Sequence, residues 1–403
     1  MSASVLYHGF GIRGYQYERT SYEDGMVTFV ISQAREQLRC PCCDSPDVDR
    51  HGEVVRTFRL LPIGRKPVQV VLAIARVFCQ KCWITRQVKV HFADEHQRYS
   101  RSFERYVLEL SRHMTIKSVA EHLQVSWDTV KEIQKRHLER HYAKPKLKRL
   151  KEIAIDEICI GKHKFLTIVL DLHTGAVVFV GNGRGADALE PFWGRLRASR
   201  AKIKAVAVDM SPAYTAAIRA NLPDATLVYD HFHIIKLYNE KLTALRRDLY
   251  REATEGLDKD VLKGIRWLLL KNPENLDPKK RERERLDEAL ELNESLFIAY
   301  YMKDQLRLLW SQPDKRTARQ FLNGWIELAN ITGIRMLMSF AKTLAGHREG
   351  ILAWYDHPIS TGPLEGTNNK IKTMQRQAYG FRDREFLILK IMAIHETKYA
   401  LVG

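Results

Sequence analysis

The sequence has no long apolar run and no recognisable export segment. Its hydrophobic stretches all fall short of the roughly 18 uninterrupted residues that a membrane-spanning helix needs. The N-terminal residues, MSASVLYHGFGIRG, lack the charged and then apolar layout of a signal peptide. These absences predict a cytoplasmic protein with no membrane partner.

Cysteine is also scarce, with six residues in 403, and a chain without an export segment is not expected to build a disulfide framework. Four of the six form two Cys-x-x-Cys pairs: Cys40, Cys43, Cys79 and Cys82. Two such pairs supply the four thiolates of a tetrahedral Zn²⁺ site. The 35 residues between the pairs exceed the usual spacing, but residues 53–78 predict a hairpin with a turn at 64–67 that returns the second pair to the first. We therefore expect a structural zinc ribbon within residues 1–95.

Other possible zinc ligands remain open at this stage. Cys42 lies inside the first pair and is able to replace Cys43. His51 and His91 are possible substitutes, although ordinary surface histidines are the simpler interpretation. Residues 1–38 predict strands around a Glu-Asp-Gly turn and suggest no chemistry.

Acidic residues are too few to balance the basic ones. The 65 Lys and Arg residues outnumber the 48 Asp and Glu residues, which gives a formal net charge of +17. Such an excess favours a polyanionic partner, and nucleic acid is the first candidate. A membrane-surface protein is the alternative, but the chain has no long basic amphipathic stretch of the kind that this role requires.

Residues 96–142 carry apolar side chains at helical spacing in three stretches. A short turn at 124–125 separates the second stretch from the third, which begins with a suitable N-cap residue, Ser126. The pattern predicts a helix-turn-helix whose second helix enters the major groove of DNA, with a plain three-helix bundle as the alternative. The residues expected to face DNA are Ser126, Trp127, Thr129, Lys131 and Lys135.

A basic linker is predicted at residues 143–152. Its cations are expected to follow DNA phosphates and to add affinity without sequence information. These residues are Lys144, Lys146, Lys148 and Arg149.

The pattern changes again at residue 153. Residues 153–239 predict three hairpin-connected strands followed by helix, strand, helix, strand and helix, which is the element order of an RNase H-like fold. Asp156 lies in the first strand and Asp209 ends the fourth, so the two carboxylates are expected to lie side by side in the sheet.

A third carboxylate lies far along the chain, on a predicted helix with the sequence PLEGTNNKIKTMQR. One face of that helix carries a carboxylate followed by groups suited to DNA phosphates: Glu365, Asn369, Lys372 and Arg376. The opposing face is mostly apolar: Leu364, Thr367, Ile371 and Met374. The polar face is therefore more than a random solvated surface.

Three converging carboxylates, Asp156, Asp209 and Glu365, repel one another unless cations neutralise them. An oxygen-only ligand set suits Mg²⁺ or Mn²⁺. Two such ions about 3.5–4 Å apart stabilise the attacking and leaving oxygens of a phosphodiester displacement. The sequence therefore predicts metal-dependent cleavage of nucleic acid.

The stretch between the second and third acids is longer than this fold requires. Residues 240–350 are helically periodic and predict a mostly α-helical insertion, and residues 351–403 predict the last helices of the catalytic part. Three tryptophans are able to stack on bases but are better interpreted as core residues: Trp267, Trp310 and Trp325. Structural rather than catalytic roles are expected for Glu157, Asp171 and Cys159.

These motifs together resemble the bacterial DDE transposases of insertion sequences, most closely the ISL-three group. The resemblance spans nearly the whole chain, and its most specific blocks are EGTNNKIK at 365–372 and QAYGFRD at 377–383. It also includes IDE at Asp156, VDMSPAY at Asp209 and DHFHIIK at 230–236. The implied architecture is a multidomain α+β chain: a β-rich zinc ribbon, a helical helix-turn-helix domain and an RNase H-like α/β catalytic domain with a mostly α-helical insertion.

The resemblance implies an enzyme that binds terminal inverted repeats, frees 3′-hydroxyls and joins them to target DNA. It implies that Asp156, Asp209 and Glu365 are the catalytic acids, with Mg²⁺ or Mn²⁺ as catalytic cofactor and Zn²⁺ as structural cofactor. Asp230 and His233 match an accompanying Asp-x-x-His motif, although a satisfied core histidine is an equal interpretation. The resemblance further implies a homodimer or larger assembly on double-stranded DNA, associated with the bacterial nucleoid. A DNA-binding regulator without catalysis and an RNase H-like nuclease are the alternatives.

Overall fold

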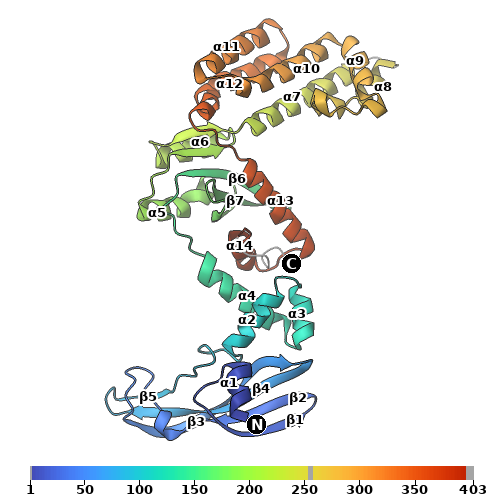
Figure 1. Cartoon of the computed structure of the whole chain (residues 1–403). Helices are drawn as coiled ribbons and strands as arrows, with labels where there is room; N and C mark the ends of the chain where they lie inside the picture. The colour runs from blue at the N-terminus through green and yellow to red at the C-terminus, as the bar shows by residue number, and fades with distance from the viewer. Residues whose placement is uncertain (1, 253–256, 396–403) are drawn as a thin grey trace. The chain divides into compact units, whose positions relative to one another are not determined.

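The computed structural model describes residues 2–252 and 257–395 (Figure 1). The chain forms two compact units, one of Met1–Ala143 with Thr373–Lys390 and one of Lys144–Lys372 with Ile391–Glu396. The six-part division predicted from the sequence is finer than these units and stays a prediction, and its last residues, 396–403, lie outside the described residues.

The N-terminal part of the first unit is a β-sheet with one helix packed on it. Its elements are α1 (Ser2–Phe10), β1 (Gln16–Glu23), β2 (Met26–Ser32), β3 (Val48–Ile63), β4 (Lys66–Cys79) and β5 (Ile84–Gln87). The strand order is β1-β2-β4-β3, and β5 pairs with the far end of β4. The hairpin predicted at 53–78 is confirmed, with Ile63 opposite Lys66 across a turn that is shorter than expected.

Residues 2–10 correct one expectation, because they form a helix where strands were predicted. Leu6 and Phe10 lie four residues apart and are only 2% and 5% exposed. Residues at this spacing share one helix face, which here closes over the apolar side of the sheet. The strand pattern of the neighbouring residues obscured this short apolar face.

The helix-turn-helix region consists of α2 (Arg101–Leu110), α3 (Ile116–Leu123) and α4 (Trp127–Tyr142). Side chains cap all three helices at their N-termini, and Ser126 accepts a hydrogen bond from the Thr129 amide as predicted. Gln124 takes a left-handed conformation with φ of 52°, which ends α3 and turns the chain sharply into α4. The predicted third helix therefore begins at the residue expected from its cap.

The second unit is built on a five-stranded sheet in the order β10-β9-β6-β7-β8. Its strands and flanking helices are β6 (Glu152–Gly161), β7 (Lys164–Asp171), β8 (Val177–Asn182), α5 (Glu190–Ser199), β9 (Ala205–Val208), α6 (Pro212–Asn221), β10 (Thr226–Tyr229) and α7 (His231–Glu252). The first three strands are antiparallel, whereas β9 and β10 run parallel to β6. This is the element order predicted for residues 153–239.

A mostly α-helical region follows the sheet, in agreement with the predicted insertion. Its remaining α-helices are α8 (Leu257–Gly264), α9 (Glu282–Glu291), α10 (Glu294–Arg307), α11 (Lys315–Ile331) and α12 (Arg335–Leu352). Trp325 is a core residue that donates its indole N–H to the Met302 carbonyl oxygen, and Trp310 packs against the same core. Trp267, in contrast, is 64% exposed, so the core interpretation does not hold for it.

Two further helices, α13 (Gly362–Gln377) and α14 (Arg384–Met392), end the described chain. The apolar face predicted for α13 is buried, since Leu364, Ile371 and Met374 are all 0% exposed. No helix within residues 2–252 and 257–395 has the length and apolar composition needed to cross a bilayer. The multidomain α+β fold class predicted from the sequence is confirmed.

Candidate active site, metal centre and DNA-binding surfaces

The register of the second sheet lines up three aspartates. Ala154 of β6 pairs with Ala207 of β9, so Asp156 and Asp209, each two residues further on, occupy equivalent positions at the same edge. Tyr229 of β10 pairs with Val208, which gives Asp230 the next equivalent position. The parallel pairing of β6, β9 and β10 therefore produces a row of carboxylates, with Asp209 and Asp230 just after the ends of β9 and β10 and Asp156 in the middle of β6.

Asp156 is the most constrained of the three. Its Oδ1 accepts a hydrogen bond from the Glu157 amide at 2.8 Å. Burial raises the pKa of Asp156, and the nearby charge of Asp209 raises it further, while His233 and the Glu157 amide lower it. A carboxylate that is destabilised by burial and by a second carboxylate favours a neighbouring cation.

Asn368 completes the surroundings of Asp156, and the sequence interpretation missed it. Its Nδ2 donates to Asp156 Oδ2 at 2.9 Å, from helix α13 to strand β6. The side chain is only 7% exposed, and its Oδ1 has no hydrogen-bond partner among the described residues. The available signal was its place one helical turn beyond Glu365, on the side of α13 between the apolar and the charged faces.

Glu365 is not gathered with the two aspartates in this conformation. Among the described residues, the only group of three or more potential ligand residues with ligand atoms all within 4.8 Å consists of cysteines. Glu365 is exposed near the start of α13, three residues before Asn368. Side chains three residues apart on a helix have Cβ atoms about 5–6 Å from each other, so Glu365 lies close to the residue that contacts Asp156.

The aspartate of the Asp-x-x-His motif forms a hydrogen bond with the segment before α13. Asp230 is 1% exposed, and its Oδ2 accepts the hydroxyl of Thr361 at 2.6 Å. His233 Nε2 lies 4.0 Å from the same carboxylate oxygen, too far for a hydrogen bond. Asp230 therefore ties the start of α7 to the segment that leads into α13. His233 is placed to act electrostatically on Asp156.

Two other acids near the row have local roles. Asp171 accepts bonds from the His173 amide at 3.0 Å and the Thr174 hydroxyl at 2.6 Å, which closes the turn after β7. Glu157 is half-buried beside Asp156, on the opposite side of the strand.

The cysteine group is formed by four residues: Cys40, Cys43, Cys79 and Cys82. Cys42 is exposed and outside the group, so the geometry selects Cys43 from the first pair. Backbone N–H groups of Cys43 and Cys42 lower the pKa of the Cys40 thiol to about 6, whereas Cys43 raises the pKa of the Cys82 thiol to about 12. Thiols packed this closely do not all ionise together, because neighbouring thiolates repel one another. A bound cation removes this repulsion.

On the predicted recognition helix α4, two of the expected DNA contacts are already engaged. Lys131 pairs with Asp383 at 2.9 Å, and Lys135 pairs with Asp383 at 3.4 Å and with Glu385 at 2.5 Å. These lysines hold the pKa of Asp383 down to about 2. Trp127 remains 48% exposed.

The other predicted DNA-binding residues are on the surface. Ser126 is exposed but its hydroxyl caps α4, and Thr129 is half-buried beside it. The linker cations are exposed: Lys144, Lys146, Lys148 and Arg149. The polar face of α13 is exposed as predicted: Glu365, Asn369, Lys372 and Arg376.

Comparisons with known protein families agree with this architecture. Residues 153–391 match the family model described as Transposase, for the DDE region of the ISL3 group. Residues 88–138 match the helix-turn-helix domain of transposase family ISL3, and residues 36–82 match the zinc-finger of transposase IS204/IS1001/IS1096/IS1165.

Full-length relatives support the same assignment. The chain is 33% identical over 390 residues to the transposase for insertion sequence element IS1001 of Bordetella parapertussis, which covers 95% of this chain and 96% of that protein. It is 30% identical over 410 residues to the transposase for insertion sequence element IS1557 of Mycobacterium tuberculosis, with 94% and 91% covered. A solved structure described as the Drosophila P element transposase strand transfer complex matches 74% of this chain and 92% of its own, with 10% identity and a TM-score of 0.38. The family model over residues 153–391 and these full-length relatives establish that the chain belongs to the ISL3 family of insertion-sequence transposases.

Proposed function

We propose that the chain binds the terminal inverted repeats of its element, cleaves the phosphodiester backbone to free 3′-hydroxyls and joins them to target DNA. The catalytic residues in this proposal are Asp156, Asp209 and Glu365. The observation that carries it is the register of β6 and β9, which sets Asp156 and Asp209 at equivalent positions of neighbouring parallel strands. Helix α13, whose Asn368 contacts Asp156, also carries Glu365.

The residues present suit divalent cations. Asp156 and Asp209 offer carboxylate oxygens, and the buried Oδ1 of Asn368 is an amide oxygen without a partner in the described chain. Oxygen donors of this kind suit Mg²⁺ or Mn²⁺ better than softer metals. When bound, such ions would polarise the scissile phosphate and favour deprotonation of the attacking water or hydroxyl.

The other side chains of this site are proposed to orient Asp156 and to bind the DNA phosphates. Asn368 holds Asp156 through its amide N–H, and the Glu157 amide holds the other carboxylate oxygen, so the orientation of Asp156 is fixed before DNA arrives. Glu365 is exposed, and a change of side-chain rotamer brings it toward Asp156. Lys372 and Arg376 follow on the same exposed face, where cations suit the phosphates that flank the cleavage site.

Zinc in this proposal is structural and is held by the four grouped cysteines. The cluster joins the loop before β3 to the turn between β4 and β5, and NH···S bonds of 3.4–3.5 Å from Cys42 and Cys82 support the two pairs. Four thiolates leave no open coordination position, which is typical of a structural site.

The experiment that tests the proposed reaction follows a labelled 3′ end. The substrate is a duplex carrying the sequence that flanks the gene, incubated with the full chain, unlabelled plasmid and Mg²⁺ or Mn²⁺. We expect nicking at the element end and transfer of the label into the plasmid. Cleavage without transfer would instead indicate an RNase H-like nuclease, and binding without cleavage at any metal concentration would indicate a regulator. Homodimerisation on DNA is part of the proposal and predicts that two labelled ends enter one complex.

The ion pairs on α4 lead to a separate prediction for Asp383→Asn. This substitution removes the negative charge next to Lys131, while Glu385 still holds Lys135. The freed Lys131 gains the ability to contact a phosphate, so the plot of log affinity against log salt is expected to steepen by about 0.9, the value for one such contact. Affinity for any duplex should rise at low salt, as measured by fluorescence anisotropy.

The fold should tolerate this change because Asp383 also caps α14 by accepting the Phe386 amide, and asparagine caps equally well. Asp287→Asn is the matched control, because it makes the same change in net charge at an ion pair with Arg283 on α9. An unchanged salt dependence in Asp383→Asn relative to this control would mean that Lys131 makes no DNA contact even when released.

A further inference from the structure

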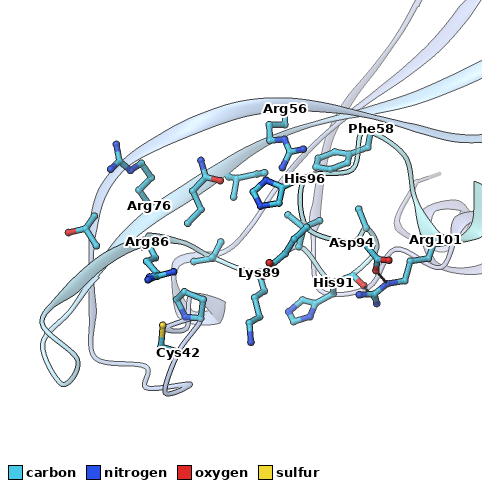
Figure 2. Close-up of a pocket in the computed structure, with 18 residues that line it drawn as sticks. Cys42, Arg56, Phe58, Arg76, Arg86, Lys89, His91, Asp94, His96 and Arg101 are labelled. Carbon is cyan, nitrogen blue, oxygen red and sulfur yellow. Dashed lines mark hydrogen bonds and ion pairs between the residues drawn. The ribbon is translucent and has the colours of Figure 1, made fainter. Parts of the chain in front are cut away.

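A strongly basic pocket lies on the N-terminal sheet and reaches the first residue of α2; it contains no residue of the recognition helix α4 or of the acidic row. Its volume is about 780 Å³. Five permanently charged cations line it against only two carboxylates, Asp94 and Glu95; the cations are Arg56, Arg76, Arg86, Lys89 and Arg101. Figure 2 shows the Asp94–Arg101 pair at one end of this basic pocket and Arg76 with Arg86 at the other.

The charges within the pocket are not balanced. Asp94 pairs with Arg101 at 2.6 Å, and this hydrogen bond lowers the pKa of Asp94. The charges of Arg136 and Arg140, 3.8 Å and 3.5 Å away, lower that pKa further. Asp94 is therefore neutralised by residues at the edge of the pocket and has little charge left for the others. The remaining cations repel one another because they have no counter-ions, and an anionic ligand would remove this repulsion.

Four of the five cations have no counter-ion within the described residues; one of them, Arg56, donates to the Gln97 carbonyl oxygen. Arg76, Arg86 and Lys89 are exposed and form no ion pair there. Arg76 lies opposite Gln87 in the β4–β5 pairing, and Arg86 lies opposite the adjacent Val77, so the two arginines come from paired strands, and both line the pocket. Planar guanidinium groups are suited to bidentate contacts with phosphate.

The pocket is structurally joined to the neighbouring domains. Pro41 and Cys42, from the first Cys-x-x-Cys pair, line one wall, and residues 85–87, which follow Cys82, line another. Arg86 is held by the pairing of β5 with β4, whose last residue, Cys79, belongs to the cysteine group. At the other end, Arg101 is the first residue of α2, and the Arg59 amide and carbonyl hydrogen-bond to the segment before it.

We propose that this basic pocket is a second DNA-binding site, which grips the phosphate backbone of the duplex that the helix-turn-helix reads. The site provides affinity without sequence preference, because it offers cations rather than groups aimed at base edges. Its continuity with α2 allows one duplex to engage both sites. The inference rests on the proposed DNA binding, but not on cleavage or strand transfer.

The test compares Arg76→Ala/Arg86→Ala with Arg19→Ala/Arg65→Ala in the full chain. Both double variants lose the same charge, but Arg19 on β1 and Arg65 in the β3–β4 turn lie outside the pocket. Removing two phosphate contacts should make the slope of log affinity against log salt concentration shallower by about 1.8. The change should be similar for the specific duplex and for unrelated duplexes. The control variant should keep the wild-type slope.

Equal slopes in the two double variants would overturn the proposal. Lys89→Ala gives a second test, in which the slope of log affinity against log salt is expected to change by about 0.9. Zinc content together with the melting temperature shows that each variant is folded.

A small phosphate ligand is the competing occupant. If inorganic phosphate at constant ionic strength binds the wild type but not Arg76→Ala/Arg86→Ala, and displaces the duplex from neither, the pocket is a small-anion site and the duplex assignment is wrong. Normal salt slopes with no strand cleavage would contradict the proposed catalysis and leave this inference intact.

Discussion

Asp156→Asn is expected to abolish cleavage and strand transfer while leaving DNA binding unchanged. Asp156 is the proposed metal ligand whose carboxylate is fixed by the Glu157 amide and by Asn368. Loss of a metal ligand removes several kcal/mol of transition-state stabilisation. Since each 1.36 kcal/mol changes a rate tenfold, we expect cleavage to fall about a thousandfold or more. The measurement is the initial rate of 3′-end release at saturating Mg²⁺.

The same substitution should not destabilise the fold. Burial and the charge of Asp209 raise the pKa of Asp156, so the ionised carboxylate is unfavourable in the folded chain when no cation is bound. Asparagine keeps an acceptor for the Glu157 amide and removes the charge, and its new N–H donor bonds to Asn368 Oδ1 once the Asn368 amide turns over. The melting temperature without metal should therefore be equal to or above that of the wild type. A lower melting temperature would show that loss of activity comes from unfolding.

Glu157→Gln is the matched control for this prediction. Glu157 is the adjacent acid on the same strand, but its side chain lies on the other face. We expect its cleavage rate to stay within a few fold of the wild type. Full activity of Asp156→Asn, or equal losses in both variants, would remove Asp156 from the catalytic assignment.

Cys79→Ala is expected to release zinc and to weaken DNA binding strongly. Cys79 is 1% exposed, and its Sγ lies 3.7 Å from that of Cys43. In small zinc domains the binding of the metal contributes about 10–16 kcal/mol to folding, although here the sheet keeps its own apolar core. We therefore expect local loss of order around the cluster rather than global unfolding, with zinc content falling from one ion per chain to near zero.

Cys42→Ala and Cys159→Ala provide the controls. Both side chains are exposed, and neither belongs to the group of four. Each variant should retain one zinc ion and wild-type affinity for DNA, whereas a chelator should bring the wild type to the behaviour of Cys79→Ala. Loss of zinc in Cys42→Ala with retention in Cys43→Ala would exchange the two residues in the proposed ligand set.

Short-range sequence patterns predicted much of this fold. The spacing of the cysteine pairs, the strand alternation at 53–78 and the cap at Ser126 are local features, and the structure contains the corresponding cluster, hairpin and helix. The order of strands and helices over 153–239 was sufficient to expect neighbouring positions for Asp156 and Asp209, because the parallel pairing of β6 and β9 follows from that order. The helix at 2–10 was missed because two apolar residues give a weak periodic signal.

Contacts between distant segments were beyond such patterns. Helical spacing places Asn368 nearer than Asn369 to the apolar face of α13, but it does not say which distant residue Asn368 meets; in the structure Asn368 donates to Asp156, since the rotation of α13 is set by the burial of its apolar face. Likewise Lys131 and Lys135 looked like free cations on a recognition helix, and their partners Asp383 and Glu385 lie some 250 residues away. Electrostatic pairing across such separations depends on packing that no periodicity encodes.

The sequence by itself determined the family, the fold class and the residue types available for chemistry, because motif spacing and hydrophobic periodicity are properties of adjacent residues. The tertiary structure decided which side chains meet. It made Asn368 the partner of Asp156, left Glu365 exposed, and gathered basic residues from β3, β4, β5 and the start of α2 into one pocket. The physical reason is that burial and charge act through space, and only the packed chain fixes those distances.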